Sequence, residues 1–433
     1  MEKSYYLHLS SDKKEYFALP ERWKPLHFVE TQEGTPPPSI EQMTREALSK
    51  STGPLLLQQL LSRAKRIAIL IDDATRPTPV AKILGVLLDH LSGSGISREN
   101  ITIVAAIGTH ETMEKDVLKG RLGGDVLSRY KVVQHNARQG DLVPVQIPED
   151  GRVVKINSAV AEANLRIAIS SVLPHPMAGY GGGPKILMPG VCNYEFIRDH
   201  HMTHVSHPQS VAGVTKGNPF HEDCMKVARA IGLDFSINCV YNQKGQAIRI
   251  IAGGLETAFE KAVSLCFEKL GCKFDEKVDV TITSTYPHTH GHQFVKGLST
   301  PDVITKSTGA ILLVAPTVGP LSAEFLGFFD MLKEKSNNNT AAYVKESLSR
   351  GEAFLPGKAI DFNMAMATVF LRPKIRVILV SPHISRQEAE TMGLEHSSSI
   401  EEGVKSLGKL YPDAKVAIFP AGGLIVPITS WKR

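Results

Sequence analysis

Arg66-Ile-Ala-Ile-Leu-Ile71, followed at once by Asp72-Asp-Ala-Thr-Arg-Pro77, is the stretch that decides the fold. Its first half is apolar and rich in isoleucine, which is typical of a strand buried on both faces of a parallel sheet. Its second half changes abruptly to carboxylates and an arginine. Polar groups directly after a buried strand mark the carboxyl edge of an open α/β sheet, where ligands bind.

The same pattern of strand, loop and helix continues on both sides of this stretch. A helix is predicted over Val80–Leu91, and further strands over Ile101–Ala106, Lys131–Gln134 and Leu165–Ser170. A strand over Ala247–Ala252 and a helix over Leu255–Leu270 complete the series. Buried strands that alternate with helices predict an α/β domain with a mostly parallel sheet.

A second series of strands begins after residues 273–277. It is predicted to comprise Val278–Thr283, Ile311–Ala315, Val377–Val380 and Val416–Phe419. The sequence therefore predicts two α/β domains with mostly parallel sheets, at 1–272 and 273–414. The tail, about residues 415–433, is free to pack back on either domain.

Composition excludes several classes of function. The 433 residues are 42% hydrophobic and 21% charged, with a formal net charge of +5, as in an ordinary globular protein. No dense basic run and few aromatic residues argue against a nucleic-acid partner. The chain has no apolar stretch of about 18 residues and no apolar leader, so we expect no membrane span and a cytoplasmic location. Five scattered cysteines predict no thiolate metal site.

Two further strand ends carry imidazoles. Gly108-Thr109-His110 follows the second predicted strand of the series, and Pro174-His175 follows the fourth. The carboxyl ends of parallel strands meet at one edge, so Asp73, Arg76 and the two histidines should gather there. Arg76 could instead pair structurally with Asp72 or Asp73.

A glycine run follows His175 and ends at a lysine: Gly179-Tyr-Gly-Gly-Gly-Pro-Lys185. It is neither a Walker loop, which needs Gly-Lys-Ser/Thr, nor a dinucleotide fingerprint. Backbone N–H groups at Gly179, Gly181, Gly182 and Gly183 can approach an anion closely, and a nearby lysine can meet a phosphate or form a covalent adduct. The run thus predicts a site for a phosphorylated cofactor, with a purely structural turn as the alternative.

Four histidines lie beyond the run, at 200, 201, 204 and 207. Spacings of three and four place pairs of them on one face of a helix, as a metal site requires. The His-Glu-x-x-His signature of zinc proteases is absent. Histidines at the surface without a ligand role remain the alternative for most of the four.

As a set, these residues resemble the nickel-pincer-nucleotide-dependent lactate racemase family. The resemblance covers most of the chain and rests on Asp73-x-Thr75-Arg76-Pro77, Gly108-Thr109-His110, His175 with the glycine run, Lys185-x-x-x-Pro189-Gly190, Tyr194-Glu195, His201 and Gln293-x-x-Lys296. It implies a nickel-pincer nucleotide (nickel pyridinium-3,5-bisthiocarboxylic acid mononucleotide), attached covalently at Lys185. It also implies that His201 ligates the nickel, with its neighbour His200 as the fallback.

The resemblance further implies the activity and the remaining roles. Enzymes of this family invert a 2-hydroxy acid by reversible hydride transfer to the cofactor, through a planar 2-keto acid. His110 and His175 would then be the catalytic base and acid, and Asp73 and Thr75 would join the glycines around the cofactor. Arg76, Lys296, Gln293 and His292 would bind the substrate in the interdomain cleft. Cofactor-synthesis enzymes would be partners in the cell, and the oligomeric state is left open between monomer and homodimer.

Departures from the family pattern bear on the substrate. His292 stands where lactate racemases have a tyrosine, and Trp23 and Trp431, the two tryptophans, lie at the ends of the chain. An aldonate or a hydroxy-dicarboxylate is therefore expected at least as much as lactate. Two rival functions stay open: a zinc- or manganese-dependent hydrolase using His200, His201 and His204, and a non-catalytic carboxylate-binding homologue.

Overall fold

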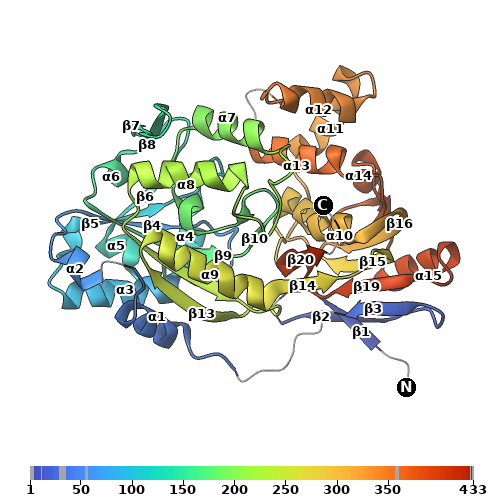
Figure 1. The fold of residues 1–433 in the computed structure, drawn as a ribbon, viewed down its shortest axis with the longest axis horizontal. Coiled ribbons are helices and arrows are strands. Elements are labelled where there is room, and N and C mark those ends of the chain that lie inside the picture. Colours follow the sequence, from blue (N-terminus) through green and yellow to red (C-terminus); the bar gives the residue numbers. More distant parts are fainter. Residues whose placement is uncertain are drawn as a thin grey trace. The chain divides into compact units, whose positions relative to one another are not determined.

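The computed structural model describes residues 4–10, 12–28, 36–53, 57–355, 360–429 and 431. Contacts within the chain divide it into two compact units. Unit 1 comprises Met1–Glu33, Gln243–Gln246 and Leu270–Arg433, and unit 2 comprises Gly34–Asn242 and Ala247–Lys269. Each unit is built on a six-stranded sheet with helices beside it (Figure 1), which confirms the predicted α/β class.

The sheet of unit 2 has the strand order β13-β12-β9-β4-β5-β6. Its strands are β4 (Ile67–Ile71), β5 (Ile101–Ala105), β6 (Lys131–Gln134), β9 (Leu165–Val172), β12 (Phe235–Tyr241) and β13 (Ala247–Gly253). Only β13 runs antiparallel to its neighbour. Five of these strands confirm the sequence prediction, and β12, whose seven residues are all buried, was not predicted.

Helices α3 and α9 of unit 2 occupy the predicted ranges to within two residues. They span Val80–Gly93 and Leu255–Leu270. Along α3 the buried residues Ile83, Leu84, Leu87 and Leu91 recur at the three- and four-residue spacing of one helix face. The other elements of unit 2 are α1 (Ile40–Ser49), α2 (Leu57–Leu61), η1 (Arg98–Asn100), α4 (Lys115–Leu122), α5 (Val126–Arg129), β7 (Leu142–Gln146), β8 (Val153–Asn157), α6 (Ser158–Ala161), β10 (Pro174–His175), β11 (Gly179–Tyr180), η2 (Gly183–Ile186), α7 (Tyr194–His204) and α8 (Pro219–Ile231).

The sheet of unit 1 is parallel throughout, in the order β18-β17-β16-β15-β19-β3. Its strands are β3 (Lys24–Phe28), β15 (Val278–Ser284), β16 (Thr305–Val314), β17 (Arg376–Val380), β18 (Glu395–His396) and β19 (Lys415–Phe419). The predicted second series of strands is present here. Around the sheet lie η3 (Gly291–Leu298), α10 (Ser299–Ile304), α11 (Ala323–Lys335), α12 (Thr340–Ser349), α13 (Ile360–Leu371), α14 (Arg386–Thr391), α15 (Ile400–Leu410) and η4 (Gly422–Leu424).

Both ends of the chain lie in unit 1, whereas the sequence assigns residue 1 onward to the N-terminal domain. The hairpin of β1 (Ser4–His8) and β2 (Lys14–Ala18) precedes β3, which pairs with β19. Trp23, 4% exposed, belongs to the core of this sheet. In the tail, β20 (Val426–Thr429) pairs with β14 (Gly271–Phe274). Backbone pairing between residues some 400 positions apart causes the difference, and hydrophobic periodicity does not report such pairing.

No helix within the described ranges is long and apolar enough to span a membrane.

Candidate active site

Asp73 and His110 are joined at the carboxyl ends of β4 and β5. The Nδ1 atom of His110 lies 2.6 Å from Oδ2 of Asp73, and Oδ1 accepts from the backbone N–H of Thr75 at 2.8 Å and from its hydroxyl. Because a carboxylate only accepts, His110 carries its proton on Nδ1 and keeps the lone pair on Nε2. Burial alone would raise the pKa of Asp73, but the His110 hydrogen bond and the Arg76 charge hold it well below its usual range.

Arg76 does not pair with either carboxylate; Arg121 binds Asp72 instead. The Arg121 guanidinium contacts the Asp72 carboxylate and donates to the carbonyl oxygens of Arg76 at 3.0 Å and Thr78 at 2.8 Å. Arg76 donates from Nη1 to the Thr75 hydroxyl at 2.9 Å. Arg76 makes no ion pair with any described residue, so its guanidinium is available to an anionic ligand.

His175 has the opposite tautomer to His110. It closes the short hairpin of β10 and β11, and its Nδ1 accepts from the N–H groups of Met177 at 3.3 Å and Ala178 at 3.1 Å. A neutral imidazole whose Nδ1 accepts must carry its proton on Nε2. Of the two predicted catalytic histidines, His110 therefore presents a lone pair at Nε2 and His175 presents an N–H at Nε2.

Three glycines of the run have a packing reason of their own. A Cβ at Gly179 would lie 2.0 Å from the Val214 oxygen, and one at Gly182 would lie 2.6 Å from the Ser171 oxygen. At Gly183 it would meet the Phe259 ring at 2.2 Å. All three have positive φ, at 75°, 74° and 51° respectively. Packing and backbone conformation therefore explain these three glycines. Binding an anion would be an additional role.

Lys185 lies at the end of the glycine run, in η2. Its Nζ sits 4.9 Å from the centre of the Phe220 ring, and it forms no ion pair among the described residues. Burial, together with the positive charge of Arg76, lowers the pKa of Lys185 to about 8. A lysine with a lowered pKa has a substantial neutral fraction near neutrality, and the neutral amine is the nucleophile.

His201 lies near the C-terminal end of α7 and is 7% exposed. Its Nδ1 donates to the Ile197 carbonyl at 2.8 Å. This bond fixes the tautomer and leaves the Nε2 lone pair for a metal, as in metal-binding histidines generally. His200 is satisfied instead: its Nε2 lies 3.2 Å from the Phe220 carbonyl, on α8. Burial lowers the pKa of His200 to about 3 and that of His201 well below its usual value.

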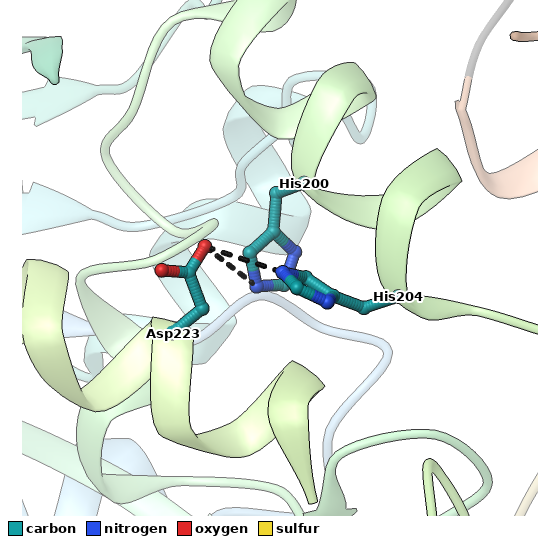
Figure 2. Close-up of side chains that lie close together, drawn as sticks. All are labelled: His200, His204 and Asp223. Atoms are coloured by element: carbon teal, nitrogen blue, oxygen red, sulfur yellow. Dashed lines mark ion pairs between the residues drawn. The ribbon is translucent and has the colours of Figure 1, made fainter. Parts of the chain in front are cut away.

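A second histidine cluster forms around Asp223, as Figure 2 shows. His200 and His204 lie with Nε2 at 3.8 and 3.5 Å from Asp223 Oδ2, and the three side chains are close enough to share an ion. The hydrolase hypothesis placed His201 in this group, and His201 does not belong to it. Arg152 also binds both oxygens of Asp223, one of them at 3.1 Å. A guanidinium on the same carboxylate repels a second cation. The hydrolase hypothesis therefore loses support.

The predicted substrate residues of unit 1 lie on η3. Lys296 donates from Nζ to Gln293 Oε1 at 2.8 Å. His292 pairs with Asp361 through Nε2 at 2.9 Å, and its ring lies against Phe325 and Phe362, with centroids 5.3 and 4.8 Å away. These contacts give His292 a structural role, so it contributes little to the argument for a polar substrate.

Two buried polar residues near the glycine run were missed by the sequence analysis. They are Ser170, on β9, and His221, in the first turn of α8. Neither Ser170 Oγ nor His221 Nδ1 has a hydrogen-bond partner among the residues that the structure describes. Asn218-Pro219 signals the start of that helix, but no motif singles out either side chain.

The chain matches one family model and is similar in sequence to two lactate racemases. The family model for the lactate racemase N-terminal domain matches residues 11–213. The lactate racemase of Thermoanaerobacterium thermosaccharolyticum is 27% identical over 404 residues, which is 90% of each chain. The lactate racemase of Lactiplantibacillus plantarum is 27% identical over 406 residues, covering 90% of this chain and 91% of the relative.

Solved structures share the fold. The apoprotein of the lactate racemase from T. thermosaccharolyticum superposes with a TM-score of 0.86 at 24% identity, covering 98% of this chain and all of that one. A Thermotoga maritima protein superposes with a TM-score of 0.66 at 18% identity, covering 92% and 100%. Over 90% of its length the chain is similar to lactate racemases, and the enzyme class that these matches indicate is that of the racemases, which are isomerases. The family model of the lactate racemase N-terminal domain matches the first part of the chain.

Proposed function

We propose that the protein racemises or epimerises a 2-hydroxy acid by reversible hydride transfer to a nickel-pincer nucleotide tethered at Lys185. The observation that carries the proposal is the set of groups at one sheet edge of unit 2. It consists of a carboxylate-bound imidazole with a lone pair at Nε2 (His110), a second imidazole with an N–H (His175), and an amine that pairs with no described carboxylate (Lys185).

The residues present fit such a cofactor. Lys185 supplies an amine of lowered pKa for the tether, and His201 supplies an Nε2 lone pair for nickel. The buried Ser170 hydroxyl, without a partner, lies beside Gly182, where a Cβ would approach it to 3.1 Å. The bound nucleotide would supply a ring carbon that takes up and returns a hydride.

The chain's own residues bind the substrate and move the proton. Arg76 would hold the substrate carboxylate with its planar fork. Gln293 and Lys296 stay proposed substrate-binding residues on the family resemblance alone. His110 accepts the hydroxyl proton at Nε2, while Asp73 stabilises the imidazolium that forms. Loss of H⁻ from Cα and H⁺ from oxygen leaves a planar 2-keto acid, and both return when the substrate is reformed. His175 would offer its Nε2–H to the substrate oxygen on the other face.

The test uses protein produced together with the cofactor-synthesis enzymes. Intact mass should show an adduct that maps to Lys185, and deuterium at C2 of the substrate should be retained during turnover. Absence of the adduct, or free exchange of that deuterium with solvent, contradicts the proposal. Free exchange would indicate proton abstraction at carbon instead of hydride transfer.

The substrate class is proposed as 2-hydroxy acids with a polar tail, such as aldonates or hydroxy-dicarboxylates, at least as much as lactate. Support comes from the lack of a tryptophan between Trp23 and Trp431. A panel of enantiopure 2-hydroxy acids, followed by polarimetry or chiral chromatography, tests this. A clear preference for lactate rejects the polar-tail substrate and leaves the racemase proposal intact.

A further inference from the structure

His221 is a buried histidine whose Nδ1 atom has no hydrogen-bond partner within the described part of the chain. It stands in the first turn of α8, which Asn218 caps by accepting from the His221 backbone N–H at 3.3 Å. The side chain is 7% exposed, and its ring stacks on Phe259 with centroids 5.5 Å apart and planes at 17°. Stacking accounts for the ring but not for its nitrogen, because a phenylalanine would pack there without burying an unpaired polar atom.

Its surroundings connect His221 to the glycine run. The Phe259 ring on which it stacks is the same ring that a Cβ at Gly183 would strike. The positive charge of Lys185 is close enough to disfavour protonation of His221, in addition to burial, and the pKa of His221 is lowered to about 4. The ring is therefore neutral near pH 7, with one N–H to donate and one lone pair.

Ser170 is a second such group beside the run. The residue is 2% exposed, and its Oγ has no hydrogen-bond partner among the described residues. The hydroxyl lies beside Gly182, where a Cβ would approach it to 3.1 Å. Two unrelated segments, β9 and α8, thus each bury an unsatisfied polar atom next to the loop that ends at Lys185. Unpaired polar groups in a folded core destabilise it, and they are explained when a ligand satisfies them.

We propose that His221 and Ser170 are binding residues for the phosphorylated mononucleotide tethered at Lys185, each donating a hydrogen bond to an acceptor atom of that group. This inference rests on the proposed function. It assigns to both residues a role in holding the cofactor and none in proton transfer.

The experiment compares His221→Phe and Ser170→Ala with wild type and with the control Phe259→Leu, which removes the stacking ring but keeps the nitrogen. All are produced with the cofactor-synthesis enzymes. We measure the Lys185 adduct fraction by intact mass, the absorbance spectrum, and the rate of nickel loss to a chelator. His221→Phe should lose nickel about tenfold faster, in line with outer contacts at metal sites, with a shifted spectrum, and Phe259→Leu should not.

The apoproteins provide a readout that is independent of loading. Removing an unpaired buried nitrogen should leave the melting temperature of His221→Phe equal to or above that of wild type. If His221→Phe does not fold, Ser170→Ala provides the same nickel-loss and spectral test. Wild-type values of adduct fraction, spectrum and nickel loss in the folded variants overturn the inference while the proposed function stands. A wild-type protein without adduct overturns both.

Discussion

Asp73 Oδ2 lies 2.6 Å from His110 Nδ1, and this contact joins the carboxyl ends of the neighbouring strands β4 and β5. It gives the histidine one defined tautomer and an anionic neighbour, the arrangement that prepares an imidazole to accept a proton at Nε2. The same carboxylate holds the Thr75 backbone and hydroxyl in place. Asp73 therefore positions His110 through a short hydrogen bond, and this relationship can be tested directly.

Replacing Asp73 by Asn should lower kcat by about 10²–10⁴-fold, the usual contribution of general acid–base catalysis. The amide removes the negative charge and can donate to Nδ1, which would favour the wrong tautomer. His110→Ala should lose at least as much activity. Both variants should retain the mass adduct at Lys185. Unchanged turnover in His110→Ala would contradict its assignment as the base, whereas a wild-type holoprotein without turnover would support a non-catalytic binding protein.

The same carboxylate makes stability depend on pH in a predictable direction. The pKa of Asp73 in the folded chain is lower than the value of about 3.9 in an unfolded chain. The unfolded chain therefore binds more protons in acid, and the stabilisation is complete above about pH 4 and lost as pH falls below it. Urea unfolding from pH 7 to pH 3 should show the difference in unfolding free energy between wild type and Asp73→Asn shrinking in acid. A constant difference would exclude this linkage.

The opposite tautomers of His110 and His175 can be observed without substrate or cofactor. Two amide N–H groups point at His175 Nδ1, and one carboxylate oxygen faces His110 Nδ1. Long-range ¹⁵N–¹H spectra of apoprotein at pH 8, assigned with His110→Gln and His175→Gln, should show the Nδ1–H form for His110 and the Nε2–H form for His175. Identical tautomers would refute the proposed division between proton acceptor and donor.

The sequence predicts where the strands end. It does not predict which of two adjacent residues, such as Asp72 and Asp73, belongs to the candidate site. Asp72 and Asp73 are adjacent, and extended residues alternate in direction. Only the structure shows that Arg121, 49 positions away, takes Asp72 and leaves Asp73 to His110. Likewise, the Phe220 carbonyl engages His200 and not His201. These assignments depend on contacts between segments that are distant in the sequence. Hydrophobic periodicity and motif spacing give no information about such contacts.

The N-terminal segment shows the same limit at the level of the fold. Strand β3 (Lys24–Phe28) is short and mostly exposed, so it lacks the apolar run that revealed β4 and β5. It becomes an edge strand because β19 offers it a backbone to pair with. The domain division drawn at residue 272, where the second series of strands begins, consequently leaves the first strands with the wrong sheet.

Lys185 should be the most reactive amine of the apoprotein near neutral pH. With its pKa lowered to about 8, about a tenth of its side chains are neutral at pH 7 and half at pH 8, whereas an ordinary lysine has a pKa of about 10.4. Brief acylation across pH 6–10, read by peptide mass spectrometry, should give a modification curve with its midpoint near pH 8. A curve that follows the chain's exposed lysines would contradict the assigned environment.

The final prediction separates the nickel site from the cluster at Asp223. His201 keeps an Nε2 lone pair because its Nδ1 donates to Ile197, whereas His204 lies against a carboxylate that Arg152 already neutralises. His201→Ala should therefore lose nickel from holoprotein. His204→Ala should keep nickel, with kcat within about threefold of wild type, because Arg152 still pairs with the Asp223 carboxylate when the His204 side chain is removed. Metal analysis of both variants decides between the sites. If wild type binds zinc or manganese and only His204→Ala loses it, the hydrolase hypothesis is supported. Only the Asp223 cluster would then hold a metal.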